Sequence, residues 1–306
     1  MDRLEAMSVL VAAVETGSFS AAGRRLGMPL PTVSRKISEL EALLKARLLV
    51  RTTRSLALTD AGTAYLAQAK RILDLVDDAE RAASGEYSAP KGELILTAPI
   101  AFGRLHVLAV VGEFLAAFPE IDVRLLLSDR NVNLIDDHVD MAVRIGALPD
   151  SGMIATRVGQ VRRVTCGSPA YLAAHGTPKT PEDLAGHACV SSAGLSQAIA
   201  WTFAAPKGGV RQVPVRCRLA VTTAEAAVDA AIAGVGLTQV FSYQVARAVA
   251  ERQLRLVLTA FEPQPAPVSL LHAGQGLLPH KMRSFLDFAV PRLGRSLADD
   301  QAGLAA

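Results

Sequence analysis

Length and composition already exclude several classes of protein. The chain has 306 residues, of which 50% are hydrophobic and 20% are charged. A chain of this length is expected to form two or three folded units, and its composition excludes disordered and collagen-like proteins. The formal net charge of +3 does not by itself identify a partner.

Cysteine usage and the N-terminus predict where the protein works. Cys166, Cys189 and Cys217 are widely spaced and lie in apolar stretches, so we expect neither a disulfide framework nor a zinc site. The N-terminus lacks the uninterrupted apolar core of a signal peptide, and we expect no membrane span, which needs about 18 apolar residues. These features predict a cytoplasmic protein without membrane contact.

Helical patterns begin at the N-terminus. Apolar residues at intervals of three and four predict a helix over 2–15: Leu4, Met7, Val11 and Val14. A second helix is expected over 19–26, because Ser18 can cap its first turn and Gly27 can end it. A third helix is expected over about 31–44, since its first residue is a proline, which suits the first helical turn. Together these segments predict a helix-turn-helix.

A small wing and a long helix are expected next. The short strand-like runs 48–51 and 55–58 predict a β-hairpin. Thr59 and Asp60 can cap a helix that extends to about residue 85, a rod of roughly 40 Å. Its apolar seam consists of Leu66, Ala69, Leu73 and Val76. Since one stripe cannot bury itself, this helix is expected to pair with a partner.

The pattern changes after a linker at 84–91 that contains Gly, Ser and Pro. Strand-like runs at 94–96, 123–127 and 141–145 alternate with helical patterns at 105–118 and 225–233. This alternation predicts an α/β architecture of mainly parallel strands covered by helices. The last residues, 297–306, are rich in Ala, Asp and Gly and are expected to be frayed.

The segment from Arg24 to Arg54 is strongly basic. It contains eight Lys or Arg residues against two acidic residues, a local excess of six positive charges that points to an anionic partner. In a helix-turn-helix, the second helix lies in the DNA major groove and nearby cations meet phosphates. A short basic helix pair that does not bind DNA has the same pattern, so the helices alone leave this alternative open.

Side chains suited to DNA contact gather at the start of the third helix. Arg35 can read guanine, Thr32 and Ser34 can contact a base or a phosphate, and Lys36 suits a phosphate. Arg51 and Arg54 of the wing suit the backbone or the minor groove. The full set of expected DNA contacts is Ser20, Arg24, Pro31, Thr32, Ser34, Arg35, Lys36, Arg51 and Arg54.

A series of motifs resembles the LysR-type transcriptional regulators. Near the N-terminus these are Phe19-Ser20-Ala21-Ala22, Thr32-Val33-Ser34-Arg35-Lys36-Ile37, Leu40-Glu41, Leu48-Leu49-Val50-Arg51-Thr52-Thr53-Arg54 and Leu58-Thr59-Asp60-Ala61-Gly62. In the second half they are Gly92-Glu93-Leu94, Phe118-Pro119, Val139-Asp140-Met141-Ala142-Val143-Arg144-Ile145-Gly146, Ser168-Pro169-Ala170-Tyr171-Leu172, His175-Gly176 and Ala233-Gly234-Val235-Gly236. The resemblance covers most of the chain.

This resemblance implies an α/β multidomain protein with a winged helix-turn-helix, a linker helix that pairs two chains, and an effector domain similar to periplasmic binding proteins. The expected bounds are 1–59 for the DNA-binding domain, 60–88 for the linker helix, 91–294 for the effector domain (subdomain I about 91–161 and 269–294, subdomain II about 162–268) and 295–306 for a flexible tail. The implied partners are double-stranded operator DNA, a small-molecule effector, a homodimer or homotetramer of the chain, and RNA polymerase. We expect no cofactor, no metal and no catalytic activity.

Two positions depart from the family pattern. Pro29 and Leu30 lie where members commonly carry a Ser cap and a Gln that reaches the bases, so base reading is expected to depend more on the residues that follow. Lys45 lies where a helix-ending Gly is common, so the third helix is expected either to end differently or to add a phosphate contact.

Two strand ends are expected to face the effector. Strand 94–98 leads through a proline into a helix, so free N–H groups around 100–104 favour an anion such as a carboxylate. Strand 219–221 leads into the cap of helix 224–233, and by analogy with the family the two loops face one another. The expected effector contacts are Thr97, Pro99, Ile100, Ser128, Arg144, Thr222, Thr223, Gln239 and Phe241. For each of them, capping or packing is the alternative role.

An enzyme or a solute-binding protein fused to a DNA-binding module is the alternative function. The densest carboxylate and histidine cluster is expected to be the solvated face of an amphipathic helix: Asp136, Asp137, His138 and Asp140. Ser168 lacks a Gly-x-Ser-x-Gly elbow, and residues 234–236 are not a complete dinucleotide fingerprint. A transport protein should carry a secretion signal and no DNA module. The regulator is therefore favoured.

Overall fold

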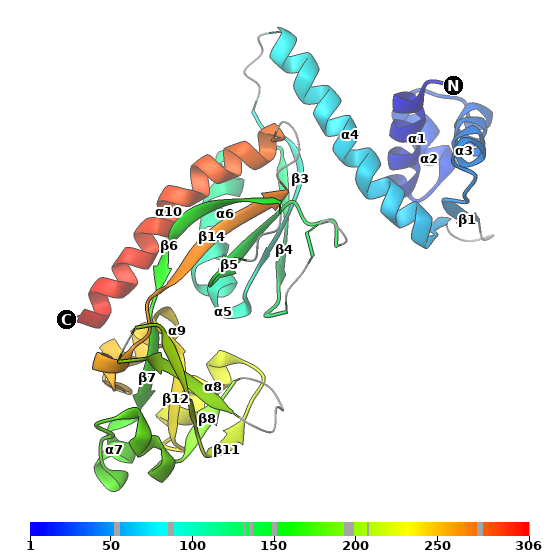
Figure 1. Ribbon diagram of the computed structural model, residues 1–306. Helices are drawn as coiled ribbons and strands as arrows, with labels where there is room; N and C mark the ends of the chain where they lie inside the picture. Colours follow the sequence, from blue (N-terminus) through cyan, green and yellow to red (C-terminus); the bar gives the residue numbers. More distant parts are fainter. Residues whose placement is uncertain are drawn as a thin grey trace. The chain divides into compact units, whose positions relative to one another are not determined.

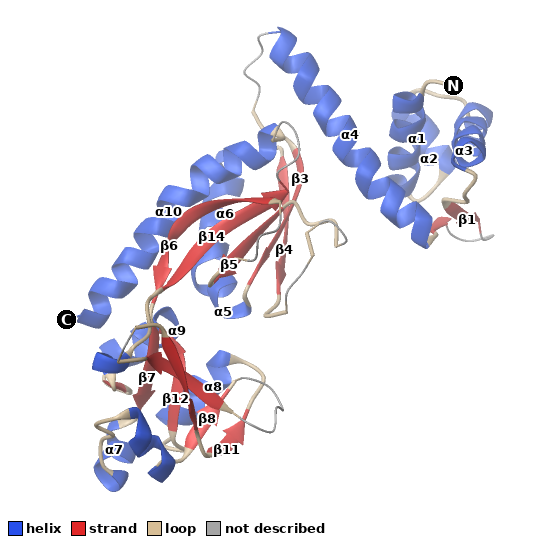
Figure 2. Ribbon diagram, viewed as in Figure 1, coloured by secondary structure: helices blue, strands red, loops and turns tan. Residues whose placement is uncertain are grey.

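A computed structural model describes most of the chain. The described residues are 1–51, 56–84, 89–130, 133–134, 137–148, 152–192, 199–206, 208–273 and 278–305. They divide into two compact units, Met1–Ala89 and Pro90–Ala306. Figure 1 and Figure 2 trace the elements of both units in chain order.

The N-terminal unit is built of helices and one small hairpin. Its elements are α1 (Arg3–Thr16), α2 (Phe19–Leu26), α3 (Leu30–Leu44), β1 (Leu49–Arg51), β2 (Leu56–Leu58) and α4 (Asp60–Ser84). Ser18 caps α2 by accepting a hydrogen bond from the Ala21 N–H, and Gly27 ends it with a φ of 65°. β1 and β2 pair antiparallel, with Leu49 opposite Leu58. The predicted helix-turn-helix and the paired wing strands are confirmed.

The third helix begins one residue earlier than the sequence predicts. Pro29 precedes it without a side-chain cap, and Leu30 is its first residue. At its end Lys45 adopts a left-handed φ of 51°, and its N–H donates to Ala42 O at 3.3 Å. Lysine thus takes the conformation that glycine usually supplies, at a cost of about 1–2 kcal/mol. The different helix ending considered for this position is not observed.

The core of this unit joins the three short helices to the wing. Its fully or almost fully buried residues are Ala6, Val9, Leu10, Ala12, Ala13, Ala22, Val33, Ile37, Leu40, Leu48 and Leu49. Ala69 of α4 is also buried, and Leu66 packs against this core. The predicted seam of α4 is therefore used partly inside the unit. Ile72 and Leu75 stay 38% and 41% exposed on α4.

Within the described residues, the C-terminal unit contains two five-stranded sheets. The first has the order β4-β3-β5-β14-β6. Its strands are β3 (Gly92–Ala98), β4 (Ile121–Leu127), β5 (Met141–Ile145), β6 (Met153–Val161) and β14 (Ala266–Ala273). The helices that pack on it are α5 (Ile100–Phe102), the π-helix η1 (Gly103–Val107), α6 (Leu108–Ala117) and α10 (His280–Ala305). These elements form subdomain I.

The second sheet has the order β11-β8-β12-β7-β13. Its strands are β7 (Arg163–Gly167), β8 (Cys189–Ser191), β11 (Cys217–Ala220), β12 (Leu237–Phe241) and β13 (Arg255–Val257). The surrounding elements are α7 (Pro169–His175), η2 (Pro181–Gly186), α8 (Ala224–Ile232), α9 (Ser242–Ala250), η3 (Thr259–Phe261) and a hairpin of β9 (Ala200–Ala204) and β10 (Val210–Pro214). These elements form subdomain II.

In each sheet one strand runs opposite to the other four. β3 pairs in parallel with β4 and β5, whereas β14 pairs antiparallel with β5 and β6. In the second sheet, β8 pairs in parallel with β11 and β12, whereas β7 pairs antiparallel with β12 and β13. The α/β architecture with mainly parallel strands is confirmed, because four of the five strands in each sheet run in the same direction. β14 and β7 are the exceptions, because they enter their sheets from the other subdomain and not through a β-α-β crossover.

The chain crosses between the two sheets twice. β6 continues through Arg162 into β7, and Glu262 lies between η3 and β14. Arg162 Nε and Nη2 donate to the two carboxylate oxygens of Glu262 at 2.7 and 2.8 Å. These hydrogen bonds raise the pKa of Arg162. The bidentate pair holds the two crossing segments together.

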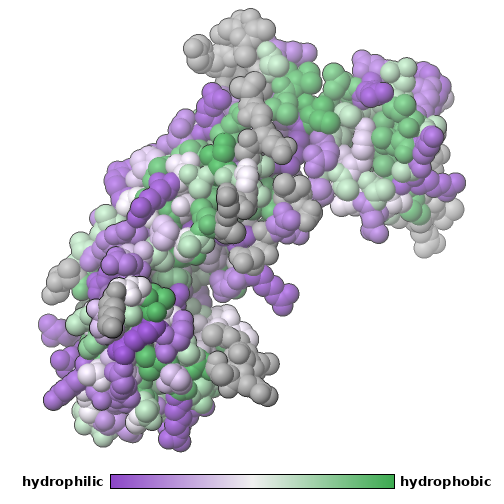
Figure 3. Space-filling view, viewed as in Figure 1, coloured by the Kyte–Doolittle hydropathy of each residue, from purple (hydrophilic) through white to green (hydrophobic). Residues whose placement is uncertain are grey.

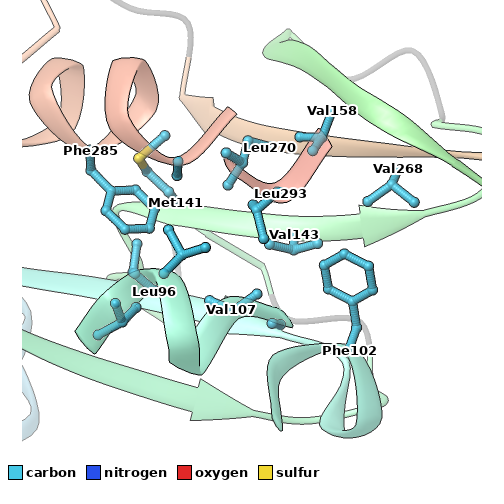
Figure 4. Close-up of a cluster of buried hydrophobic side chains, with 14 of the residues drawn as sticks. Leu96, Phe102, Val107, Met141, Val143, Val158, Val268, Leu270, Phe285 and Leu293 are labelled. Carbon is cyan, nitrogen blue, oxygen red and sulfur yellow. The ribbon is translucent and has the colours of Figure 1, made fainter. Parts of the chain in front are cut away.

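The largest core lies in subdomain I. Figure 4 shows side chains from the strands, from α5 and η1, and from α10 meeting in it. The helical segment Ile100–Ala117 has a mean hydropathy of 1.6 over 18 residues, so by length and composition it could cross a membrane, which the sequence analysis did not anticipate. Phe102, Val107 and Phe114 of this segment are buried in the core. We therefore interpret it as a core helix.

The C-terminal residues are helical rather than frayed. α10 continues through the residues expected to form a flexible tail, 295–306, as far as Ala305. Leu297 is 3% exposed, and a Cβ on Gly159 of β6 would lie 2.8 Å from it. His106 Nδ1 and Ser296 Oγ lie 2.8 Å apart. The prediction of a flexible tail is wrong, because these contacts with η1 and β6 are not visible in the composition of the segment.

The packing of the tail is tested by Leu297→Ala. We expect this substitution to lower the free energy of unfolding by about 2–5 kcal/mol, because it leaves a cavity beside a glycine. Asp299→Ala, at an exposed position two residues on, is the matched control and should change the free energy of unfolding by less than about 0.5 kcal/mol. Urea unfolding followed by circular dichroism measures both. Equal effects of the two substitutions would contradict the packing.

Candidate functional site

Most residues expected to contact DNA lie on two consecutive helices. Ser20 and Arg24 lie on α2, and Pro31, Thr32, Ser34, Arg35 and Lys36 lie in the first two turns of α3. The exposed ones are Ser20, Arg24, Pro31 and Arg35, and the partly buried ones are Thr32, Ser34 and Lys36. The side chain of Arg51 and all of Arg54 lie outside the described residues, so the predicted wing contacts stay predictions.

Arg35 is an accessible cation in the second turn of α3. Its side chain is 63% exposed, and Nη1 donates to Glu39 Oε1 at 2.8 Å. An exposed pair one helical turn apart contributes only about 0.3–0.5 kcal/mol. The guanidinium can therefore exchange Glu39 for a base edge at little cost.

Lys36 has a different environment from the neighbouring arginine. Its Nζ forms an ion pair with Glu5 of α1, and its side chain is only 13% exposed. The contact ties α3 to α1 inside the unit. The structure therefore does not support the predicted phosphate contact of Lys36, because its charge is already matched by a carboxylate and its ammonium is mostly covered.

Two carboxylates to which the sequence analysis assigned no structural role organise this unit. Glu15 accepts from Arg25 at 2.8 Å and from Lys70 of α4 at 2.9 Å. Burial alone would raise the pKa of Glu15, but the two cations outweigh it and lower the pKa. Glu41 Oε1 accepts the N–H groups of Leu48 and Leu49 at 2.8 and 3.1 Å, which fixes the start of the wing. No local pattern predicts partners so far along the chain.

In the first expected effector loop, hydrogen-bonding groups of three predicted residues already have partners within the protein. The Ile100 N–H donates to Asp129 Oδ1 at 3.0 Å, so an internal carboxylate occupies the place expected for an anion. Thr97 is 3% exposed and donates its hydroxyl to Leu126 O at 3.0 Å. Ser128 Oγ accepts a backbone N–H two residues on, at 3.1 Å. The structure therefore favours the packing or capping role for Thr97, Ile100 and Ser128.

The second expected loop lies close to the first. Thr223 caps α8 by accepting the N–H three residues on, at 3.3 Å, whereas Thr222 is exposed. Arg104 Nε of η1 lies 3.8 Å from Glu225 Oε1 in the first turn of α8. The loops are thus brought together in the way the resemblance implies. Of the predicted residues in these loops, Thr222 is exposed, and the partly buried ones are Pro99, Ile100, Ser128 and Thr223.

A second group of side chains lies on one face of the second sheet. In the pairing of β7 with β12, Arg163 lies opposite Phe241 and Thr165 lies opposite Gln239. Gln239 Oε1 accepts the Thr202 N–H at 3.1 Å, and Nε2 donates to Thr202 O at 3.0 Å. The side-chain amide of Gln239 therefore holds β9 against the sheet, which favours a structural role over the predicted effector contact.

Sequence reasoning missed Arg163, which stands out on this face. Its guanidinium carbon lies 4.5 Å from the centroid of the Phe241 ring, and burial lowers its pKa. Within the described part of the chain Arg163 forms no ion pair, whereas the adjacent Arg162 is paired with Glu262. A partly buried cation without a counter-ion favours a bound anion. Burial also lowers the pKa of the predicted contact Arg144.

The carboxylate and histidine cluster has a structural role where it is described. Asp140 is 6% exposed and accepts the Ile95 N–H at 2.9 Å, and Asp137 accepts the Asn133 N–H at 2.9 Å. Residues 137–138 form a turn, so the predicted amphipathic helix is wrong there, and Asp136 lies outside the described residues. The two described carboxylates bind backbone N–H groups, which explains them without catalysis.

Two family models match this chain and together span most of it. Residues 4–63 match the model described as "Bacterial regulatory helix-turn-helix protein, lysR family". Residues 88–294 match the model described as "LysR substrate binding domain". The first range covers the helix-turn-helix and wing, and the second covers both subdomains.

Curated proteins and solved structures agree with these models. The chain is 35% identical over 289 residues to an HTH-type transcriptional regulator of Xanthomonas campestris pv. campestris, which covers 93% of this chain and 84% of that protein. It is 32% identical to the probable regulator LtrA of Klebsiella pneumoniae, covering 94% of each. The structure of CrgA, a LysR-type transcriptional regulator from Neisseria meningitidis, has a TM-score of 0.61 and 31% identity and covers 95% of this chain and 98% of that chain.

Arg35 and Lys36 should respond differently to substitution. We expect Arg35→Ala to weaken binding to a specific DNA site by about 1–3 kcal/mol while thermal stability is unchanged, since the side chain is exposed. We expect Lys36→Ala to lower the melting temperature instead, because Glu5 loses its partner. Gel retardation with specific and unrelated DNA, and thermal unfolding, measure the two effects. Equal losses on both DNAs for Arg35→Ala would make it a phosphate contact.

Proposed function

Because the chain belongs to the LysR family of transcriptional regulators, with a DNA-binding module and an effector-binding domain, we propose that it acts in the cytoplasm as an assembly of identical chains that responds to a small organic anion. The effector favours one relative orientation of the two subdomains, and this change alters how the assembly binds DNA. RNA polymerase is the further partner that this role requires. We propose no catalytic activity for the chain.

The exposed polar face of α2 and α3 supports direct DNA contact. Arg24 and Arg35 are exposed cations on it, and Ser20 is an exposed hydroxyl residue beside them. Thr32 and Ser34 keep part of their surface accessible. We propose that α3 lies in the major groove, where Arg35 contacts a base and the neighbouring side chains contact bases or phosphates.

The environment of Arg163 carries the proposal for the effector's chemistry. The sequence predicted a carboxylate held by free N–H groups at 100–104, but Asp129 occupies the Ile100 N–H. Arg163 is positively charged, and because it is partly buried, its charge is unfavourable without a counter-ion. The ring of Phe241 lies beside its guanidinium. We propose that the effector's carboxylate binds Arg163 and that its apolar part contacts Phe241, which was among the predicted effector contacts.

Exposed apolar residues on two helices support self-association. Ile72 and Leu75 are exposed on α4, whereas Ala69 of the same helix is buried. Figure 3 shows hydrophobic surface along this helix. Leu105, Leu108 and Leu115 are exposed on the helical segment that packs on the first sheet. Large exposed apolar patches mark interaction surfaces. We propose that α4 forms the homodimer and that the second surface joins dimers into a tetramer.

The effector proposal is tested with two matched pairs of probes. Benzoate and succinate should raise the melting temperature of the full chain, by a stabilisation of up to about 2.7 kcal/mol at a hundred times the dissociation constant, and benzamide and succinamide should not. Arg163→Gln should abolish the shift. Arg157→Gln, at an exposed position, is the control and should keep it. Amides as effective as carboxylates, or a shift that survives in Arg163→Gln, would contradict the proposal.

The dimer proposal is tested by Leu75→Glu. A charge in an apolar interface is costly, so we expect this variant to be monomeric and to bind operator DNA at least tenfold more weakly. Gln68→Glu adds the same charge at an exposed position of the same helix and should remain dimeric. Light scattering after size-exclusion chromatography measures the mass. A dimeric Leu75→Glu would place the interface elsewhere.

A further inference from the structure

Two of the three cysteines lie side by side in the second sheet. Cys217 of β11 is the direct register partner of Cys189 of β8, in a parallel pair. The Cys189 N–H donates to the Arg216 carbonyl at 3.0 Å, which fixes this register. Neighbouring strands lie about 4.7–4.9 Å apart, and disulfides join residues whose Cα atoms are about 4.4–6.8 Å apart. The strand pairing therefore brings the two backbones to a distance that a disulfide can span.

The two thiols also lie on the same face of the sheet. Partners in a parallel pair direct their side chains to the same side. Cys189 is also the register partner of Leu237 in β12, and both belong to the buried apolar cluster that covers this face. At present each thiol donates to a carbonyl of its own segment, Cys189 to His187 O and Cys217 to Leu219 O. Rotation about χ1 would turn the sulfurs toward one another.

The two thiols differ in accessibility. β11 is the edge strand of the sheet, and Cys217 is only partly buried. Cys189 is 0% exposed, and burial together with the nearby Cys217 raises its pKa to about 12. Cys166 is buried on β7, separated from β8 by β12, and has no cysteine as register partner. An oxidant from solvent therefore reaches Cys217 before the other two.

We propose that Cys189 and Cys217 form a reversible disulfide when the protein meets a hydroperoxide. The O–O bond of the peroxide breaks: one oxygen is transferred to the Cys217 sulfur to give a sulfenic acid, and the other leaves as an alcohol, or as water in the case of hydrogen peroxide. The Cys189 thiolate then attacks the Cys217 sulfur, the S–O bond breaks, and hydroxide leaves and takes up the Cys189 proton as water. Two thiols are oxidised and one peroxide bond is reduced.

The crosslink would join the edge strand to its neighbour beside the loop that carries Thr222 and Thr223. β11 ends at Ala220, and the Val221 N–H donates to Ser191 O at 2.9 Å. Thr222 and Thr223 follow, and Thr223 caps α8. A covalent bond between β8 and β11 restrains the strand that carries this loop. The proposal goes beyond the effector response and does not depend on it.

The test counts thiols in the full chain. Reduced protein is treated with hydrogen peroxide, then unfolded and titrated with a thiol reagent. We expect free thiols to fall from three to one, with a mass loss of about 2 Da, a Cys189–Cys217 crosslinked peptide, and recovery by dithiothreitol. Closure should be faster at higher pH, because Cys189 must lose its proton to attack.

Two variants act as controls. Cys217→Ser, at a partly buried edge position, should lose no thiol to an intramolecular bond. Cys166→Ala should still lose both of its remaining thiols. A Cys217 oxidised only to sulfinic acid, a disulfide between two chains, or three thiols that survive treatment would each overturn the proposal. None of these readouts requires DNA or effector, so failure here is distinct from failure of the proposed function.

Discussion

The double crossing between the two sheets is the constraint on which the C-terminal unit depends. β14 lies between β5 and β6, so the first sheet is complete only after the chain has built the second and returned. The Arg162–Glu262 pair joins the outgoing and returning segments with two hydrogen bonds, and both side chains are partly buried. Breaking one partner of such a pair leaves an uncompensated charge. This junction therefore sets the geometry within which two subdomains can respond to a ligand.

The same junction explains why one of two adjacent arginines is available to a ligand. Arg162 forms an ion pair with Glu262. Arg163 lies over the ring of Phe241, and the described residues supply no carboxylate there. At the first strand end the situation is reversed, because Asp129 already satisfies the Ile100 N–H. Internal ion pairing thus decides which positive groups remain for an effector. Among the described residues, a carboxylate matches the strand-end N–H group, and none matches the partly buried Arg163 guanidinium.

In the N-terminal unit, charge pairing divides the basic residues in a similar way. Lys36 and Lys70 are held by Glu5 and Glu15 and contribute to the packing of α3 and α4 against α1. Arg35 has only a solvent-exposed partner one turn away. A local excess of positive charge is therefore not a uniform DNA-binding surface. Some cations are paired across helices inside the unit, whereas Arg35 pairs only across one exposed helical turn among the described residues.

The sequence by itself determined the parts whose causes are local. Caps and glycines bound α1 and α2, apolar spacing predicted the helices, and the motif series identified the family, because these signals lie within a few residues of one another. Only the tertiary structure decided the rest. The antiparallel strands β14 and β7, the packed C-terminal helix, the environment of Arg163, the burial of Lys36 and the strand pairing of Cys189 with Cys217 all depend on contacts between residues far apart in the chain. Local periodicity predicts which face a side chain occupies, but long-range strand order and ion pairing determine what it meets there.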